Sequence, residues 1–347
     1  MRRIGLSLLL MTMVAAVLPA SAVGGQPPVA FDDPTPGTTW YRSAGTIRVR
    51  WYEPASLSIT ARVLVRQMGA LDVNGGCGAA RFPVPSTHAV PSSAVREPDA
   101  SGNRRVVMKL AGHLTNRCYR YRVRLTYADG REVKSSLSGA FRTVTTWTGG
   151  YSVYRSSAFS TQRTYVWCIA AGVQMMRNYV TGASDHSSTT QQRYYDYARA
   201  NDRFPNERFP GSDAQGWAAA ARYATGVTHY GWRAHSSYRE SLRYAALSLR
   251  RSGKPVGLMV ARGGHAWLMT GFRATADPIA TSDYEVTDVF ISGPLYPMQQ
   301  SNGYDRPPNT RFSYGYLDDF YVPFRSLPGE NSELWHGKYV SVTAWTD

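Results

Sequence analysis

Residues 162–180 read QRTYVWCIAAGVQMMRNYV, and this stretch decides the fold of the second half of the chain. From Ile169 onward, apolar and small side chains recur at the spacing of one buried helix face. Thr181 and Gly182 then end the helix. Cys168 is therefore expected in the first turn, where unpaired N–H groups and the helix dipole favour a thiolate. The alternative is a buried cysteine that acts as a small apolar side chain.

A second motif follows about 100 residues later. Residues 254–261 (KPVGLMVA) are typical of a buried strand, and Arg262-Gly263-Gly264 of a turn. His265 opens the next strand, where it can meet a helix N-terminus. The other six histidines have no metal-ligand spacing to a partner, so we expect no metal site and no cofactor.

Together these motifs resemble the papain-like cysteine peptidases, in particular the bacterial group of bacteriocin-leader-processing (double-glycine) peptidases. Gln162 stands six residues before Cys168, which is the spacing of that family's oxyanion-hole glutamine, and Gly264-His265-Ala266 is similar to its histidine strand. The resemblance implies an α+β papain-like domain over residues 148–347 and a polypeptide substrate. It also implies Cys168 as nucleophile, His265 as its proton-transfer partner and Gln162 as an oxyanion donor.

The third catalytic position departs from this family. The family places Asn or Asp at the end of the next strand, but here residues 284–294 end in Ser-Gly-Pro. Ser292 and Asp288 are the alternatives for orienting His265, and at about 13 Å apart along the strand they cannot both serve. If neither serves, activity is impaired. Residues 296–319 are expected to form a loop, and residues 339–345 an edge or closing strand.

The N-terminal half shows the two-residue period of β-strands from about residue 38 to residue 145. Ile47, Val49 and Trp51 alternate with polar side chains. The clearest strand is 119–125, in which every second residue from Arg120 is an arginine. Gly130, after Asp129, marks a hairpin turn.

This half resembles a fibronectin type III domain. Leu114 stands five residues before Tyr119, which matches the tyrosine corner of such sandwiches. The resemblance implies an all-β sandwich over residues 23–147 with an adhesion or spacer role. An insertion carries Cys77, and a disulfide from Cys77 to Cys118 would tie it to the sandwich; two unpaired buried thiols are the alternative.

In the fibronectin topology the strand with Arg62 and Arg66 lies beside the strand with Arg120, Arg122 and Arg124. Residues 23–147 hold 17 basic and 8 acidic side chains, so this half carries most of the chain's formal charge of +15. An arginine-rich face could bind an anionic cell-wall polymer, and a plain solvated face is the alternative. We expect no nucleic-acid partner.

The N-terminus predicts export. Arg2 and Arg3 precede an apolar run over residues 6–18, and small residues suggest cleavage near Ala22, so residues 1–22 are expected to be a signal peptide. We expect a secreted or cell-wall-associated protein with no membrane span after cleavage. Three cysteines without a Cys-x-x-Cys pair exclude a zinc ribbon.

Three functions remain open from the sequence. The first is a secreted cysteine peptidase. The second is a peptidoglycan-directed amidase or endopeptidase that uses the same Cys–His pair, although the Asp-Cys-Ser-Gly and Cys-x-x-Tyr signatures of those enzymes are missing. The third is a catalytically impaired surface protein that only binds.

Overall fold

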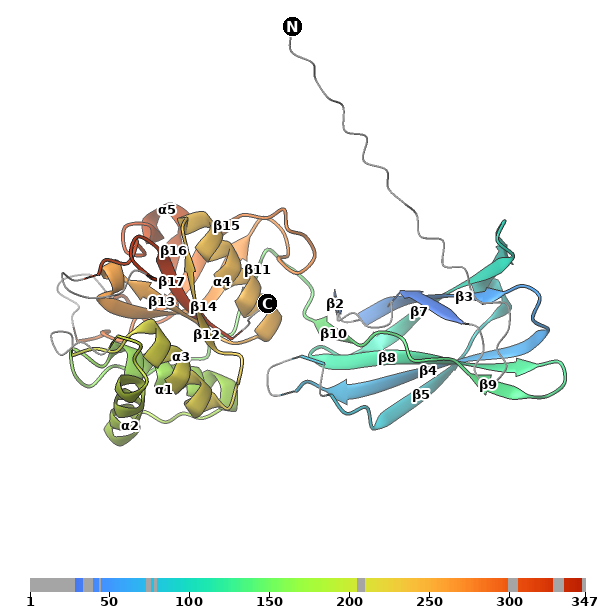
Figure 1. Cartoon of the computed structure of the whole chain (residues 1–347), viewed down its shortest axis with the longest axis horizontal. Helices are drawn as coiled ribbons and strands as arrows, with labels where there is room; N and C mark the ends of the chain where they lie inside the picture. Colours follow the sequence, from blue (N-terminus) through green and yellow to red (C-terminus); the bar gives the residue numbers. More distant parts are fainter. Residues whose placement is uncertain are drawn as a thin grey trace, which may run out of the picture.

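The computed structural model describes residues 29–33, 40–43, 45–72, 76–77, 80–204, 210–298, 305–326 and 334–344. Within these ranges the chain is rich in strands, which form three sheets. Two sheets draw their strands from residues 30–144, and the third draws its strands from residues 150–343 (Figure 1). The predicted signal peptide, residues 1–22, lies outside the described residues.

The first part is built from strands and one 3-10 turn, η1 (Ser92–Ala94), over its described residues. One sheet has the order β1-β3-β7-β6, and the other has the order β2-β10-β8-β4-β5 with β9 paired to β8. The strands are β1 Ala30–Asp33, β2 Trp40–Ser43, β3 Gly45–Pro54, β4 Ile59–Ala70, β5 Val84–Ala89, β6 Val95–Pro98, β7 Asn103–His113, β8 Arg117–Tyr127, β9 Glu132–Lys134 and β10 Phe141–Val144.

Side chains alternate between the two faces of each strand, and those that face inward form the core of this part. Val49 and Trp51 of β3 are buried, as are Tyr121 and Val123 of β8, and all four belong to one apolar cluster. The Tyr119 hydroxyl accepts a hydrogen bond from the Leu114 backbone N–H (2.8 Å), which is the contact expected of a tyrosine corner. The disulfide predicted between the insertion and β8 is present, joining Cys77 to Cys118.

The register corrects the predicted arginine face. β4 and β8 do lie side by side, but Arg62 is opposite the buried Leu125, and Arg66 is opposite the buried Tyr121. These two arginines therefore point to the other side of the sheet from Arg120, Arg122 and Arg124, because side chains alternate along a strand. Arg62 forms an ion pair there with a buried glutamate, Glu53. Of the five arginines predicted for the outer face, only the three of β8 lie on it.

The second part combines a sheet with helices on both faces. The sheet has the order β12-β17-β13-β14-β15-β16, and β11 pairs with β14. Its strands are β11 Gly150–Ser152, β12 Gly231–His235, β13 Val256–Val260, β14 His265–Ala274, β15 Val286–Ser292, β16 Thr310–Ser313 and β17 Tyr339–Thr343. The helices are α1 Cys168–Thr181, α2 Ser188–Ala200, α3 Ala214–Thr225, α4 Tyr238–Ser252 and α5 Tyr314–Leu317, with 3-10 turns η2 Ser156–Ala158 and η3 Ala261–Gly263.

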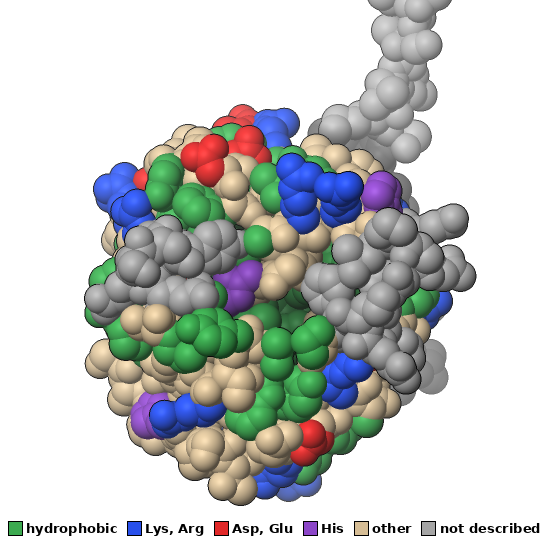
Figure 2. Space-filling view, turned by 90° about the vertical axis from the view of Figure 1, so that its left-hand side faces the viewer, with side chains coloured by type: hydrophobic (Ala, Val, Ile, Leu, Met, Phe, Trp, Pro, Cys, Tyr) green, Lys and Arg blue, Asp and Glu red, His purple; other side chains and the backbone are tan. Residues whose placement is uncertain are grey.

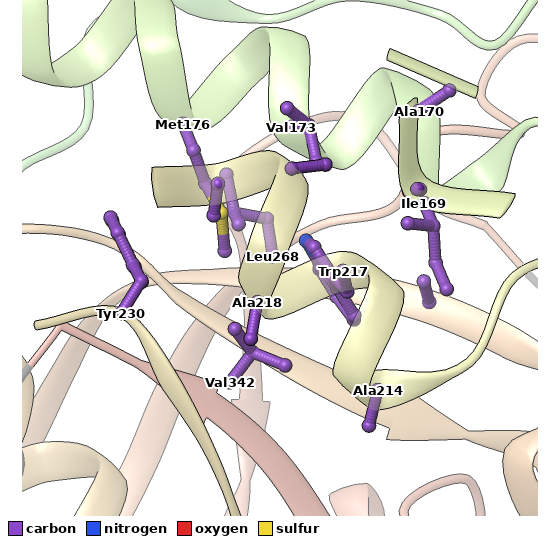
Figure 3. Packing of buried hydrophobic residues seen from close by; sticks show 14 of the residues in the cluster. Ile169, Ala170, Val173, Met176, Ala214, Trp217, Ala218, Tyr230, Leu268 and Val342 are labelled. Atoms are coloured by element: carbon purple, nitrogen blue, oxygen red, sulfur yellow. The ribbon is translucent and has the colours of Figure 1, made fainter. Parts of the chain in front are cut away.

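The sheet has an apolar cluster on each face. Leu268 of β14 belongs to the cluster under α1, α2 and α3, whereas its neighbour Met269 belongs to the cluster under α4. In Figure 1, α1–α3 lie together on one side of the sheet and α4 and α5 lie on the other. Figure 3 shows Val173 and Met176 of α1 beside Trp217 and Leu268, so the core fixes α1 against β14.

Residues 339–343 form a strand as predicted, but two details predicted for the C-terminal segments are wrong. β17 is not an edge strand, because it pairs with β12 on one side and with β13 on the other. Residues 296–319 are not a plain loop, since they contain β16 and α5. Both errors have one cause: strand order depends on pairings between segments far apart in the sequence, and the period of a single segment does not report them.

Contacts between the two parts gather at the end of α4. Arg142 of β10 donates to the carbonyl of Arg251, and Arg250 donates to the carbonyl of Thr145 (2.8 Å) in the connecting segment. Lys254 lies just beyond, 7% exposed. Burial and the charge of Arg142 lower the pKa of Lys254 to about 8.

Candidate active site

The centre of the candidate site is a buried histidine–carboxylate pair. His265 opens β14, and its Nε2 lies 3.1 and 3.2 Å from the two carboxylate oxygens of Asp305. His265 is 7% exposed and Asp305 is 3% exposed. A buried carboxylate that faces one ring nitrogen fixes the orientation of the imidazole and leaves Nδ1 for a reaction partner.

Two further groups hold the Asp305 carboxylate. The indole Nε1 of Trp267 donates to Oδ1 (2.6 Å), and the backbone N–H of Leu295 donates to Oδ2 (2.6 Å). Trp267 is two residues beyond His265, so both side chains lie on the same face of β14. With His265, these donors satisfy a carboxylate that would be costly to bury alone.

Gly293 makes room for this carboxylate. A Cβ added at Gly293 would lie 2.5 Å from Cγ of Asp305, which is closer than real Cβ atoms approach. Ser292 or Gly293 occupies the place at the end of β15 where the resemblance implies Asn or Asp. The missing side chain is thus replaced by a carboxylate from the segment that follows.

Ser292 and Asp288, the two predicted alternatives, are engaged elsewhere. The Ser292 hydroxyl accepts from the Asn309 backbone N–H (3.1 Å). Asp288 forms an ion pair with Arg311 (2.7 Å) and lies opposite Arg273, which is roughly 26 Å along β14 from His265. The structure replaces both alternatives with Asp305, which the sequence analysis missed. One signal was available: Asp305 is the sole acidic residue between Asp288 and Asp318.

Cys168 is the first residue of α1, as predicted, and it is 9% exposed. Of the three cysteines it alone is free, because Cys77 and Cys118 are bonded to each other. Trp167, the residue before the helix, gives no side-chain hydrogen bond to the helix N-terminus, and the first turn holds no acidic residue. The backbone N–H groups of this turn therefore act on Cys168 without a competing carboxylate.

Cys168 and Asp305 both act on the charge state of His265. Burial lowers the pKa of His265, but hydrogen bonds to Asp305 and Cys168, together with the negative charges of both groups, raise it, so that the result is a pKa raised to about 9. At neutral pH the imidazole is therefore protonated. The imidazole of His265 thus lies between the Cys168 side chain and the Asp305 carboxylate.

The turn before His265 is strained and braced. Ala261 and Arg262 have φ values of 52° and 60°, in the left-handed region that costs non-glycine residues energy. The Ala261 N–H donates to the Phe320 carbonyl (2.9 Å), and the Arg262 carbonyl accepts from the Arg325 N–H (3.0 Å). These bonds hold the turn and so fix where β14 begins.

Gln162 is buried at the start of the loop that leads to α1. Its Nε2 donates to the Thr164 carbonyl (2.7 Å), and the Trp167 N–H donates to the same carbonyl (3.2 Å). Its backbone N–H donates to the Pro294 carbonyl (2.8 Å), beside the Leu295 N–H that holds Asp305. The Gln162 amide keeps a second N–H group that can donate to another acceptor.

The surface at the left-hand side of Figure 1 is hollowed near its centre, and hydrophobic side chains lie beside the hollow (Figure 2). Over the described ranges no group of three His, Cys, Asp or Glu side chains could hold a metal ion. No helix within those ranges has the length and apolar character needed to cross a membrane.

No protein family matches the chain, and no curated protein matches it. Among solved structures it is similar to Astrotactin-2, described as a vertebrate-specific, perforin-like membrane protein involved in neuronal development (12% identity, TM-score 0.24, 58% of this chain and 35% of that one). It is also similar to a chicken TCR (12% identity, TM-score 0.19, 35% of this chain and 61% of that one). The chain thus spans less than two thirds of either protein, and likenesses this distant decide neither fold nor function.

Proposed function

We propose that the protein is a cysteine peptidase with Cys168, His265 and Asp305 as its catalytic residues. The observation that carries this proposal is the buried pair of His265 and Asp305 with Cys168 as the second hydrogen-bond partner of the imidazole. In this arrangement Asp305 holds Nε2, so Nδ1 is left to exchange a proton with the thiol.

The proposed reaction has two steps. The Cys168 thiolate attacks the carbonyl carbon of a peptide bond, and the oxyanion receives hydrogen bonds from the Cys168 N–H and the Gln162 amide. The C–N bond then breaks, and the leaving amine takes the proton of His265. In the second step a water gives its proton to neutral His265 and attacks the thioester, which releases the acid and restores the thiolate.

The same proposal includes the two folds that the sequence resembles, a fibronectin type III-like module and a papain-like domain. The tyrosine corner and the two packed sheets support a fibronectin type III-like module before the catalytic part. A helix headed by Cys168 and packed on a sheet that carries His265 supports a papain-like arrangement. The disulfide fits an exported protein, because such bonds persist in oxidising compartments. Binding of cell-wall polymer remains a prediction that rests on the three arginines of β8.

The test uses the full mature chain and its one free thiol. Iodoacetamide at mildly acidic pH should modify Cys168 much faster than it modifies free cysteine, and the label should map to the peptide containing residue 168. The Cys168→Ala variant should lose cleavage of casein. Cys168→Ser is the matched control for packing, since it keeps the volume and lacks the thiolate.

A slow reaction of Cys168, at the rate of free cysteine, together with casein cleavage that survives Cys168→Ala, contradicts the proposal. Release of soluble fragments from peptidoglycan, but not from casein, would favour the amidase or endopeptidase reading of the same residues. Fast labelling without cleavage of either substrate would favour a protein that binds only.

A further inference from the structure

Gln191 of α2 holds the chain on both sides of Gln162. Its side-chain oxygen accepts from the Arg163 backbone N–H (3.0 Å), and its side-chain nitrogen donates to the Thr161 carbonyl (2.8 Å). The Gln191 side chain is fully buried. Because these bonds end on the residues directly before and after Gln162, they fix the backbone from which the Gln162 side chain extends.

The Gln191 amide is itself held in one orientation. Its nitrogen also donates to the side-chain oxygen of Gln174 in α1 (2.7 Å), and the Gln174 nitrogen donates to the Ser187 carbonyl (3.1 Å). Gln174 is as fully buried as Gln191. If the Gln191 amide were turned by 180°, its oxygen would face the Thr161 carbonyl and its nitrogen would face the Arg163 N–H. Burial and these contacts therefore leave the amide a single orientation.

The Gln162 amide lies near the start of α1. Its nitrogen and the Trp167 backbone N–H donate to the same carbonyl oxygen, that of Thr164 (2.7 and 3.2 Å). The two nitrogens are therefore no further apart than these two distances combined, and Trp167 directly precedes Cys168. Oxyanion donors act by being held in place before the reaction. For this amide to serve as one, the backbone that carries it must be fixed.

We infer that Gln191 is a positioning residue for the oxyanion donor. This inference rests on the proposed function and on the role of Gln162 in it. Gln191 acts through the backbone of residues 161–163, so its loss should displace the Gln162 amide from the oxyanion. Because the oxyanion forms only during the reaction, kcat should fall while KM changes little.

The experiment compares two buried glutamines in the full mature protein. Gln191→Met keeps a side chain of similar length and removes both bonds to residues 161–163, so kcat for a peptide should fall about 10- to 100-fold, less than for loss of the donor itself. Gln174→Met is the matched control, because it breaks the contacts of Gln174 with Gln191 and Ser187 but leaves both bonds from Gln191 to residues 161–163. It should keep most of its kcat. Equal losses of kcat in the two variants overturn the inference.

A double-mutant cycle tests whether Gln191 acts through Gln162. Gln162→Ala alone should lower kcat by about 10²- to 10³-fold, and adding Gln191→Met should lower kcat no further. Losses that multiply would show that Gln191 acts by another route, and the inference would fail. If Gln191→Met does not fold, Gln191→Asn takes its place in both experiments, since its shorter side chain keeps an amide but cannot reach both backbone partners.

The reactivity of Cys168 separates this inference from the peptidase proposal. Alkylation by iodoacetamide forms no oxyanion, so Gln191→Met should be labelled at the rate of the unmodified protein while its kcat is lowered. Slower labelling would mean that the substitution has disturbed Cys168, which contradicts the inference. If the unmodified protein cleaves peptides and Gln191→Met keeps its kcat, the inference fails and the peptidase function stands. If the unmodified protein cleaves no peptide, both are refuted.

Discussion

Replacing Asp305 separates its charge from its hydrogen bonds. In Asp305→Asn the amide oxygen can still accept from Trp267 and His265, which both contact Oδ1 (2.6 and 3.2 Å). The amide nitrogen then faces the Leu295 N–H, so one donor loses its partner. In Asp305→Ala all three donors lose their partner.

The magnitude follows from the pKa of His265. Its rise from 6.5 to about 9 corresponds to about 3 kcal/mol of preference for the imidazolium, and Asp305 and Cys168 share that preference. Because the folded pKa is raised, this stabilisation is complete below pH 6.5 and is lost as pH rises through about 9. Asp305→Asn removes the charge, so the pKa of His265 should fall below 9.

The assay is kcat/KM for a peptide as a function of pH from 5 to 10. The unmodified protein should lose activity along an alkaline limb near pH 9, as imidazolium is lost. In Asp305→Asn that limb should move to lower pH, with a moderate loss at its optimum. In Asp305→Ala activity should fall by about 10³- to 10⁴-fold, the scale of losing the orienting group in other triads.

Stability measurements show whether a loss of activity comes from unfolding of the variant. Asp305→Ala leaves the Trp267 and Leu295 N–H groups buried without an acceptor, which costs about 1–3 kcal/mol each in the free energy of unfolding. Denaturant unfolding checks that the variant is still folded in the assay. An alkaline limb that stays near pH 9 in a folded Asp305→Asn protein refutes the assignment of Asp305.

Three other substitutions test neighbouring parts of the structure. Trp267→Phe keeps a ring and removes one donor to Asp305, so kcat should fall about tenfold with little change in KM. The free energy of unfolding should fall by about 1.5–3 kcal/mol. An unchanged kcat would contradict the role of the indole. Gly293→Ala should displace the carboxylate and shift the alkaline limb, whereas Gly315→Ala, whose Cβ meets nothing within 4 Å, should leave the pH profile unchanged. Burial lowers the pKa of Lys254, so Lys254→Met should raise the free energy of unfolding by up to about 3 kcal/mol below pH 8. This gain should vanish towards pH 10.5. A gain in the free energy of unfolding that does not depend on pH would point to packing instead.

Sequence patterns predicted the structural features that depend on contacts between neighbouring residues. The helix headed by Cys168 ends at Gly182 in the left-handed conformation (φ 83°), as the sequence indicates. The disulfide between Cys77 and Cys118 was also predicted from the sequence, and it is present. The end of the helix depends on a few neighbouring residues. The disulfide was predicted from the expected export of the protein to an oxidising compartment.

The orienting carboxylate could not be read in the same way. Asp305 lies on a segment with no helical or strand period, and it reaches His265 because Gly293, directly after β15, leaves room for its carboxylate. The central place of β17 depends likewise on pairing with β12 and β13, whose partners are distant in the sequence. Single-sequence patterns report which face of a strand is buried, but they do not report which strand lies beside it.

The turn at residues 293–295 contacts two parts of the proposed catalytic site. Its Leu295 N–H holds Asp305, and its Pro294 carbonyl accepts the backbone N–H of Gln162 (2.8 Å). A change in this turn should therefore disturb both the pKa of His265 and the placement of the oxyanion donor, whereas loss of the Trp267 indole should disturb only the first. Gly293→Ala should accordingly cost more in kcat than Trp267→Phe does, even though it removes no hydrogen-bonding group. If the two losses are equal, the turn supports Asp305 alone, and Gln162 is placed by the loop contact with Thr164 instead.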